Sequence, residues 1–165
     1  MLFRSAGEAD GEGLATRRNL LIDGGVLSMF VHNSYTGRRS GAASTGNAIR
    51  GYSSTPGAGT IALALTPGER EQAEIIAGID DGVLIQGVSG LHSGVNPVSG
   101  DFSTGADGLR IRNGELAEPL REFTIGSTLQ RMLLDVIEVG GDLDWLPSSA
   151  AGLSLVVGDV TLSGA

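Results

Sequence analysis

The clearest structural signal in the chain is the stretch 108–119, GLRIRNGELAEP. Two runs of strand-forming sequence flank Asn113-Gly114. An Asn-Gly pair favours the type I′ turn, whose twist matches that of two paired strands. The stretch therefore predicts an antiparallel β-hairpin, with both Asn113 and Gly114 at positive φ.

Several other segments have the composition of short strands. Residues 20–22 and 26–31 flank Asp23-Gly24-Gly25 and predict a second hairpin. Residues 60–65, TIALAL, alternate larger side chains with alanine, as expected of a strand with one tightly packed face. Three more apolar runs are predicted strands, namely 83–88, 153–157 and 160–163, the last two paired around Gly158-Asp159.

Two segments have helical signals. Thr66 as N-cap, Pro67 at the first helical position and Glu69 as capping-box partner predict a helix from there to residue 77. Between residues 127 and 139, apolar side chains recur at helical spacing and predict one buried stripe, made up of Leu129, Met132, Leu133, Val136 and Ile137. The predicted fold class is therefore α+β and strand-dominated, with a mainly antiparallel twisted sheet and two helices.

Composition limits the classes of function. The 165 residues fit one domain, and 41% hydrophobic with only 18% charged residues favours a folded chain. The net charge of −8 disfavours binding to a phosphate backbone, so no nucleic-acid partner is expected. No apolar run reaches the roughly 18 residues of a spanning helix, and no membrane partner is expected. The absence of cysteine is compatible with a reducing compartment, and the cytoplasm is the expected location.

The histidines give little support to a catalytic or metal site. His32 and His92 are the only two, and they lie sixty positions apart. Neither begins a His-Glu-x-x-His motif, which would place two ligands on one helical face. Distant ligands can meet in a fold, so a metal site shared by the two histidines stays an alternative. The favoured interpretation is that both are ordinary loop or edge residues.

Residues 90–103, GLHSGVNPVSGDFS, form the most unusual segment of the chain. Asn-Pro and Ser-Gly-Asp are turn formers whose side chains can bond their own backbone. The segment predicts an ordered loop that is either a structural double turn or the lining of a groove or interface. The candidate groove or interface residues are His92, Asn96, Pro97, Ser99, Asp101 and Phe102.

A family resemblance rests on this loop and its surroundings. The residues that carry it are 94–103, then Gly108, Ile111, Asn113-Gly114-Glu115 and Pro119, preceded by 12–18, 25–27, Tyr35-Thr36 and 44–48, and followed by Thr124-Ile125, Leu129, Met132-Leu133, Ile137, Val139-Gly140 and Asp142-Leu143. Their order and spacing resemble the C-terminal domain of the TldD/PmbA family, also called modulators of DNA gyrase. The resemblance covers nearly the whole chain after about Glu12.

The resemblance implies metal-dependent proteolysis in the cytoplasm by a paired assembly, with unfolded proteins or small peptides as substrates. In zinc-bearing members a His-Glu-x-x-x-His helix precedes this region, and a cysteine ligand lies near the C-terminus. This chain has no such motif, and residues 148–152 contain no cysteine. It therefore resembles the PmbA (TldE) type more closely, and no catalytic or metal-binding residue is carried over. Zinc is expected only in a TldD-type partner.

These observations predict residues 1–12 as a disordered or truncated start, and residues 13–165 as the family's C-terminal domain. The leading hypothesis is a non-catalytic domain, a fragment of a larger subunit, that shapes the peptide chamber or contacts a zinc-bearing homologue or a second copy. One alternative is an independently active hydrolase using His92 with Ser93, Asp101 or a bound metal. Another is a β-rich binding module unrelated to proteolysis.

Overall fold

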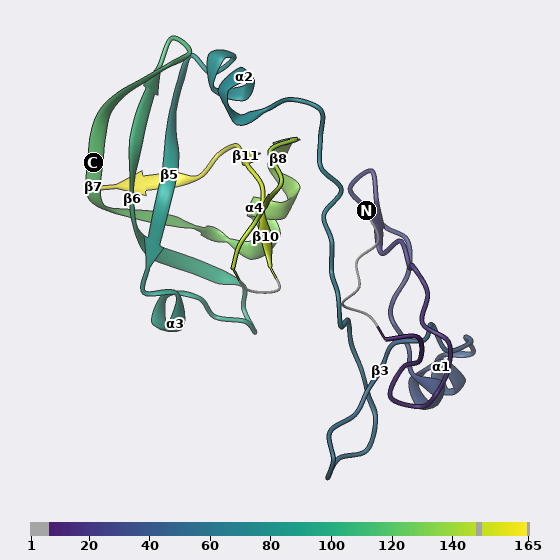
Figure 1. Ribbon diagram of the computed structural model, residues 1–165. Coiled ribbons are helices and arrows are strands. Elements are labelled where there is room, and N and C mark those ends of the chain that lie inside the picture. The colour runs from purple at the N-terminus through teal and green to yellow at the C-terminus, as the bar shows by residue number, and fades with distance from the viewer. Residues whose placement is uncertain (1–6, 148–149, 165) are drawn as a thin grey trace. The chain divides into compact units, whose positions relative to one another are not determined.

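Residues 7–147 and 150–164 are described by the computed structural model in Figure 1. The chain divides into two compact units, Met1–Leu65 and Thr66–Ala165, called here unit 1 and unit 2. In the described residues, unit 1 has one helix and unit 2 has three, and each unit has its own antiparallel strand pairs.

Unit 2 is built on a four-stranded antiparallel sheet with the order β12-β7-β6-β5. Its strands are β5 (Asp81–Ser89), β6 (Asp101–Arg112), β7 (Glu115–Thr128) and β12 (Thr161–Ser163). Asn113 and Gly114 join β6 to β7 with φ of 48° and 79°. These are the left-handed values that a type I′ turn requires, so the predicted hairpin is confirmed.

The main sheet carries the hydrophobic core of unit 2. Phe123 on β7 is fully buried at 0% exposure and packs with Ala106 and Ile125. Partly buried apolar residues surround this cluster, namely Val83, Phe102, Leu120 and Val160. Aromatic burial of this kind supplies a large share of the stability of a small core.

Shorter elements complete unit 2. The helices are α2 (Gln72–Ala77), α3 (Leu91–Gly94) and α4 (Leu129–Leu134). Two further antiparallel pairs are β8 (Val136–Val139) with β11 (Leu155–Val157), and β9 (Asp144–Trp145) with β10 (Ala151–Gly152).

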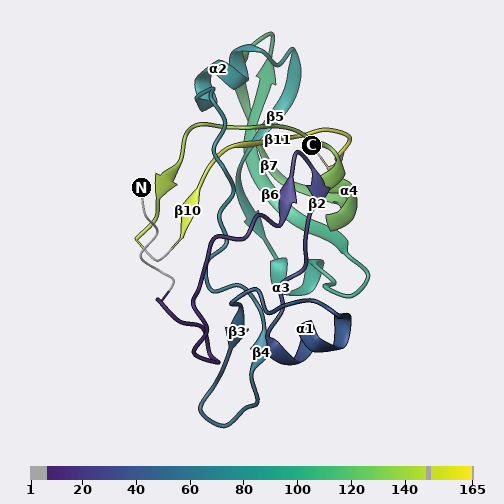
Figure 2. The same cartoon turned by 90° about the vertical axis from the view of Figure 1, so that its right-hand side faces the viewer.

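Unit 1 contains less regular structure. Its elements are β1 (Ile22–Asp23), β2 (Val26–Leu27), α1 (Ser34–Ser40), β3 (Ala48–Ile49) and β4 (Gly57–Ala58). Figures 1 and 2 show α1 beside the β3–β4 pair. Asn33, the N-cap of α1, donates from Nδ2 to Pro56 O, just before β4, at 2.8 Å. The predicted hairpin around Gly24-Gly25 is confirmed with shorter strands, because Ile22 pairs with Leu27 and Asp23 with Val26.

The predicted α+β, strand-dominated and antiparallel class is confirmed. Within the described residues the chain forms four helices, where the sequence predicted two. The predicted strand at 83–88 is confirmed as part of β5. None of the helices in the described stretches is long and apolar enough to span a membrane.

The predicted helix over 127–139 is wrong in its second half. It ends at Leu134 with Asp135 as C-cap, and the chain continues as strand β8. The predicted buried stripe fails as well, because Leu133 is 72% exposed. The physical reason is that β-branched Val136 and its neighbours pair with β11, so a long-range strand contact overrides the helical spacing.

Three other predictions are corrected. Residues 60–65 form no strand. The helix predicted from Thr66 begins only at Gln72, because Glu71 is the N-cap and its N–H is satisfied by the Glu74 carboxylate at 3.0 Å. The two closing strands do not pair with each other, since β11 pairs with β8 and β12 with β7.

Candidate functional site

The candidate site is the signature loop, defined as residues 90–103, between β5 and the first residues of β6. Gly90 turns the chain at φ 77° into the short helix α3. The loop then closes on itself, because Asn96 N donates to Asp101 O at 2.9 Å and Gly100 N donates to Asn96 O at 2.8 Å. Val95 forms an isolated antiparallel bridge with Phe102.

Side chains hold the turns inside this loop. Asn96 Oδ1 accepts from Val98 N at 2.9 Å and from Ser99 N at 3.2 Å. The Ser99 hydroxyl donates to the Asp101 carboxylate at 2.6 Å. These polar groups are used on neighbouring backbone or on each other, which is the behaviour expected of Asx and Ser turns.

The loop is also fixed to α4 and to β6 by close backbone approaches. Gly100 O accepts the N–H of Leu129 at 2.7 Å, and Gln130 Nε2 donates to Ser99 O at 3.4 Å. A Cβ on Gly100 would lie 2.0 Å from Oε1 of Gln130, and one on Gly94 would lie 2.0 Å from Ser103 O. The Ser103 carbonyl excludes a side chain at Gly94, whereas Gly100 favours glycine through its φ of 83°, so the loop path is set by close contact and backbone conformation as well as by hydrogen bonds.

The structure brings the predicted loop residues together on one short segment, with most of their side chains exposed. The exposed ones are His92, Asn96, Pro97, Ser99 and Asp101, whereas Phe102 is half-buried against the core of unit 2. In the described part of the chain, His92 makes no hydrogen bond to Ser93 or Asp101, and the Ser93 hydroxyl donates to Gly90 O at 3.2 Å. The nucleophile and base geometry of the hydrolase alternative is therefore not formed here.

Sequence reasoning missed a bend that crosses the main sheet. The register shifts at the same level in β5, β6 and β7, around Gln86, Asp107 and Glu122. Glu122 has φ 56°, uncommon for a non-glycine residue, and its N–H donates to Asp107 Oδ1 at 3.1 Å. An open cavity of about 480 Å³ lies at this bend and includes Gln86, Asp107, Arg121 and Glu122 in its lining. No turn signal in the sequence marks the bend, because bulges depend on pairing between strands.

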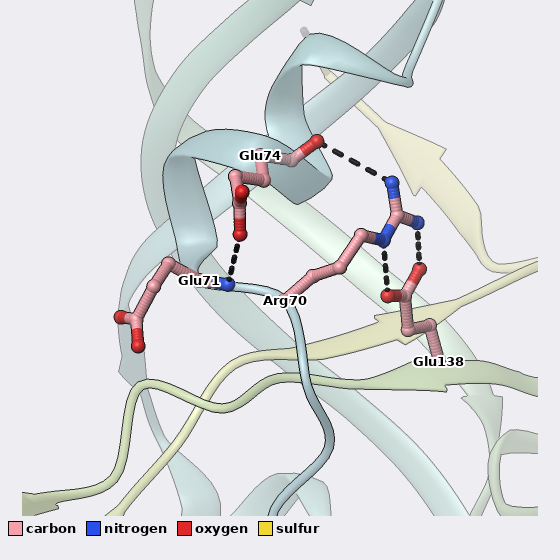
Figure 3. Close-up of polar contacts among 4 residues, drawn as sticks. All are labelled: Arg70, Glu71, Glu74 and Glu138. Atoms are coloured by element: carbon pink, nitrogen blue, oxygen red, sulfur yellow. Dashed lines mark hydrogen bonds and ion pairs between the residues drawn. The ribbon is translucent and has the colours of Figure 1, made fainter.

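A second missed feature is the ion pair that holds the approach to α2 (Figure 3). Arg70 donates to both carboxylate oxygens of Glu138 on β8, and its Nη1 also donates to Glu74 O at 3.4 Å. The hydrogen bond from Arg70 lowers the pKa of Glu138, and the same contact raises the pKa of Arg70. The Arg70 side chain is about half exposed and that of Glu138 is partly buried, so solvent screens the pair and its main role is to orient the segment.

Backbone contacts reinforce this ion pair. Gly68 N donates to Gly140 O at 2.9 Å, and Gly141 N donates to Arg70 O at 2.7 Å. A Cβ on Gly68 would lie 1.9 Å from Val139 O, so the two segments cross too closely for any other residue. The segment before α2 is thus fixed to the end of β8.

Among residues 7–147 and 150–164, no three His, Cys, Asp or Glu side chains lie close enough together to hold a metal ion. His32 lies in unit 1, with Nδ1 3.3 Å from the Thr36 hydroxyl, and His92 lies in unit 2. The described residues therefore do not fit a zinc site of the usual three or four ligands.

Comparison with known proteins identifies the family. The model of the PmbA/TldA metallopeptidase C-terminal domain matches residues 3–164. The chain belongs to the PmbA/TldD family. The Haemophilus influenzae protein named Metalloprotease PmbA homolog is 32% identical over 157 residues, which is 94% of this chain and 32% of that protein. A Buchnera aphidicola protein named Metalloprotease TldD homolog is 30% identical over 81% of this chain and 28% of its own length.

Solved structures give the same result for the fold. A Thermotoga maritima protein assigned to the modulators of DNA gyrase superposes with a TM-score of 0.85, at 32% identity over 98% of this chain and 36% of that one. TldE from Thermococcus kodakarensis superposes with a TM-score of 0.74, at 31% identity over 90% of this chain and 34% of that one. The chain spans about a third of the length of the PmbA/TldD relatives it matches.

Many residues that carried the family resemblance have structural roles in unit 1. Thr45 Oγ1 accepts the His32 N–H at 2.7 Å and donates to His32 O at 3.0 Å. Asn47 Oδ1 accepts from Asn19 Nδ2 at 2.8 Å, and Asn47 Nδ2 donates to Gly59 O at 3.1 Å. In this PmbA/TldD domain these polar side chains join segments that lack long strands.

Proposed function

We propose that this domain is a non-catalytic C-terminal part of a PmbA/TldE-type subunit in a cytoplasmic TldD/PmbA metallopeptidase assembly. In this proposal the signature loop shapes the peptide chamber or the contact with a second subunit. The partner is a TldD-type homologue that bears the zinc, or a second copy of this chain. The substrate class is an unfolded protein or a peptide.

The observation that carries the proposal is the internal use of the loop's polar groups. Asn96, Ser99 and Asp101 hold turns, and the loop's carbonyls receive hydrogen bonds from α4. A segment fixed in this way suits a rigid recognition or contact surface better than a reaction centre that must move protons. The sequence supports the PmbA/TldE type, because residues 148–152, where zinc-bearing members are expected to have a cysteine ligand, contain none.

Co-expression with a TldD-type homologue tests the catalytic assignment. We expect zinc and peptidase activity to follow the TldD-type chain, and His92→Ala to leave the zinc content unchanged. The matched control is His32→Ala, which removes the other histidine of the chain. Stoichiometric zinc bound to this chain alone, and lost on His92→Ala, would contradict the proposal.

The loop itself is tested by Asn96→Ala and Asp101→Ala. Asn96→Ala removes the acceptor of two backbone N–H groups, and Asp101→Ala removes the acceptor of the Ser99 hydroxyl. We expect a loss of about 1 kcal/mol per hydrogen bond, measured by chemical unfolding, together with weaker assembly. Val98→Ala is the control in the same loop, because that side chain is 92% exposed.

The opposite result would give the loop a different role. If both variants keep full stability and assembly but abolish a peptidase activity of the isolated chain, the loop is catalytic. If this chain binds no zinc-bearing homologue, the result would instead favour the hypothesis of a binding module unrelated to proteolysis.

A further inference from the structure

Residues 60–65 have the chemistry of a strand but no strand partner within the described chain. The segment TIALAL has no charged residue, and its larger side chains fall at every second position. Ile61, Leu63 and Leu65 are exposed by 53%, 76% and 53%. In an extended chain, residues at this spacing point to one face, so the segment presents a continuous apolar face to solvent.

The backbone of this segment is unpaired as well. β4 ends at Ala58, and Gly59 N makes the last contact by donating to Asn47 O at 3.0 Å. Beyond it, residues 60–65 make no hydrogen bond to any other described residue, and Figure 1 draws them as an extended ribbon leaving β4. Both the amides and the carbonyls of the segment are therefore available to another strand.

A flexible linker would have a different composition. Linkers are rich in glycine, serine, proline or charged residues, because such sequences stay hydrated without a partner. This segment consists of one threonine followed by five apolar residues. Residues that interrupt strands occur only at its ends, where Gly59 precedes the segment and Pro67 follows two residues after it. This pattern is typical of a strand that is ended on each side by a glycine or a proline.

The PmbA/TldD relatives are longer than this chain, and their additional residues are a source of a partner strand for residues 60–65. The match spans 32% of the Haemophilus influenzae protein and 36% of the Thermotoga maritima one, so about two thirds of each lies outside it. Other apolar side chains of unit 1 are exposed too, including Val26, Leu27 and Phe30. Contiguous exposed apolar surface is typical of an interface.

We propose that residues 60–65 are an edge strand that pairs with an extended segment from the part of a full-length PmbA/TldD protein that this chain does not span. A strand is the occupant that fits, because only an extended backbone satisfies the free amides while covering alternate apolar side chains. The proposal is independent of whether the assembly is catalytic. It concerns the fold of the full-length protein.

Hydrogen–deuterium exchange of a peptide covering residues 60–65 tests the pairing. The isolated chain is compared with a chimera in which it replaces the matched residues of the Haemophilus influenzae homologue. We expect exchange to slow by about tenfold or more in the chimera, since paired amides exchange only on opening. Leu63→Asp should remove this protection, whereas Val98→Asp, at a fully exposed position of unit 2, should leave it unchanged.

Four outcomes would overturn the proposal. Equal exchange in the chimera and the isolated chain, with the Ala48 amide protected in both, would show that the segment stays unpaired in a folded protein. Protection in the isolated chain at every concentration would mean that the chain covers its own segment. Protection that rises with concentration would make a second copy the partner. If the chimera does not fold, the aligned segment of the intact Haemophilus influenzae protein is measured, and fast exchange there would overturn the proposal equally.

Discussion

The two units of the chain reach order by different means. In the described part of unit 2, the buried side chains are mostly apolar and centre on Phe123, Ala106 and Ile125. In the described part of unit 1, the buried polar side chains are Asp10, Asn33 and Thr45, and the other buried residues are Ala48 and two glycines. The difference is one of interaction type as well as of size.

Unit 1 has little regular secondary structure because polar side chains bind its backbone groups. Asp10 accepts from Glu12 N and Leu14 N through one oxygen, and from Ala48 N through the other. Asn33 caps α1 and donates to Pro56 O. Side chains therefore satisfy backbone groups that strand ladders satisfy in unit 2. Polar networks of this kind specify one arrangement, because each missing partner is costly.

The largest expected effect is in the core of unit 2. Phe123→Ala should destabilise unit 2 by about 3 to 5 kcal/mol, because it removes a fully buried aromatic side chain and leaves a cavity. Chemical unfolding followed by the fluorescence of Trp145, the single tryptophan, measures this loss. Leu133→Ala is the control, and we expect it to cost less than about half a kcal/mol because its side chain is 72% exposed. Similar losses in both variants would contradict the assignment of the core.

The two hairpin turns allow a matched comparison between the units. Gly25 and Gly114 have φ of 82° and 79°, but a Cβ on Gly25 meets open space, whereas one on Gly114 would lie 2.7 Å from Ala77 O. Gly25→Ala should cost about 1 to 2 kcal/mol from left-handed strain alone. Gly114→Ala should cost about 2 kcal/mol or more, because the clash with α2 is added.

Thermal or chemical unfolding of both variants tests this difference. Resonances from each unit, followed separately by NMR, assign the loss to the unit that carries the change. Equal losses would show that α2 moves away from the turn at no cost. The contact between the hairpin tip and the helix would then contribute nothing to unit 2.

Local signals made some elements predictable from the sequence. Asn113-Gly114 and Asp23-Gly24-Gly25 determine their turns through the conformations of a few residues, and both hairpins are present. The end of α2 was predictable for the same reason, since Gly78 is its C-cap. Helix α1 was missed although Asn33 and Gly41 cap it, because its residues SYTGRRS contain no apolar stripe.

Elements that depend on distant partners were not predictable. The spacing from Leu129 to Ile137 favoured one long helix, but Val136 and its neighbours form β8 because β11 is available to pair with them. The bend at Asp107 and Glu122 likewise depends on three strands together. For the candidate site, the turn residues and the ordered path of the loop were predictable. Its attachment to α4 was not, since Leu129 and Gln130 are remote in sequence.

The smallest of the three effects concerns the polar interior of unit 1, at Asp10. Burial opposes ionisation of this carboxyl, but the N–H groups of Ala48, Glu12 and Leu14 outweigh it and lower its pKa. Asp10→Asn keeps one oxygen but turns an N–H toward the Ala48 amide, so one hydrogen bond to a charged group is lost. The expected cost is about 1.5 kcal/mol at neutral pH. Glu8→Gln removes the same charge from an exposed side chain and is the control.

The pH dependence of the stability of unit 1 provides a second test of the role of Asp10. Because the pKa of Asp10 is lower in the folded state, its contribution is fully present above the unfolded value of about 3.9 and is lost as pH falls through the folded value. Unit 1 of the unmodified chain should therefore lose stability below about pH 4, and Asp10→Asn should lack this component. The measurement is NMR-detected exchange of the Ala48 amide with urea unfolding between about pH 2.5 and 7. If Asp10→Asn and Glu8→Gln show the same stability and the same acid profile, the buried carboxylate does not organise unit 1, and the contrast with the apolar core of unit 2 fails.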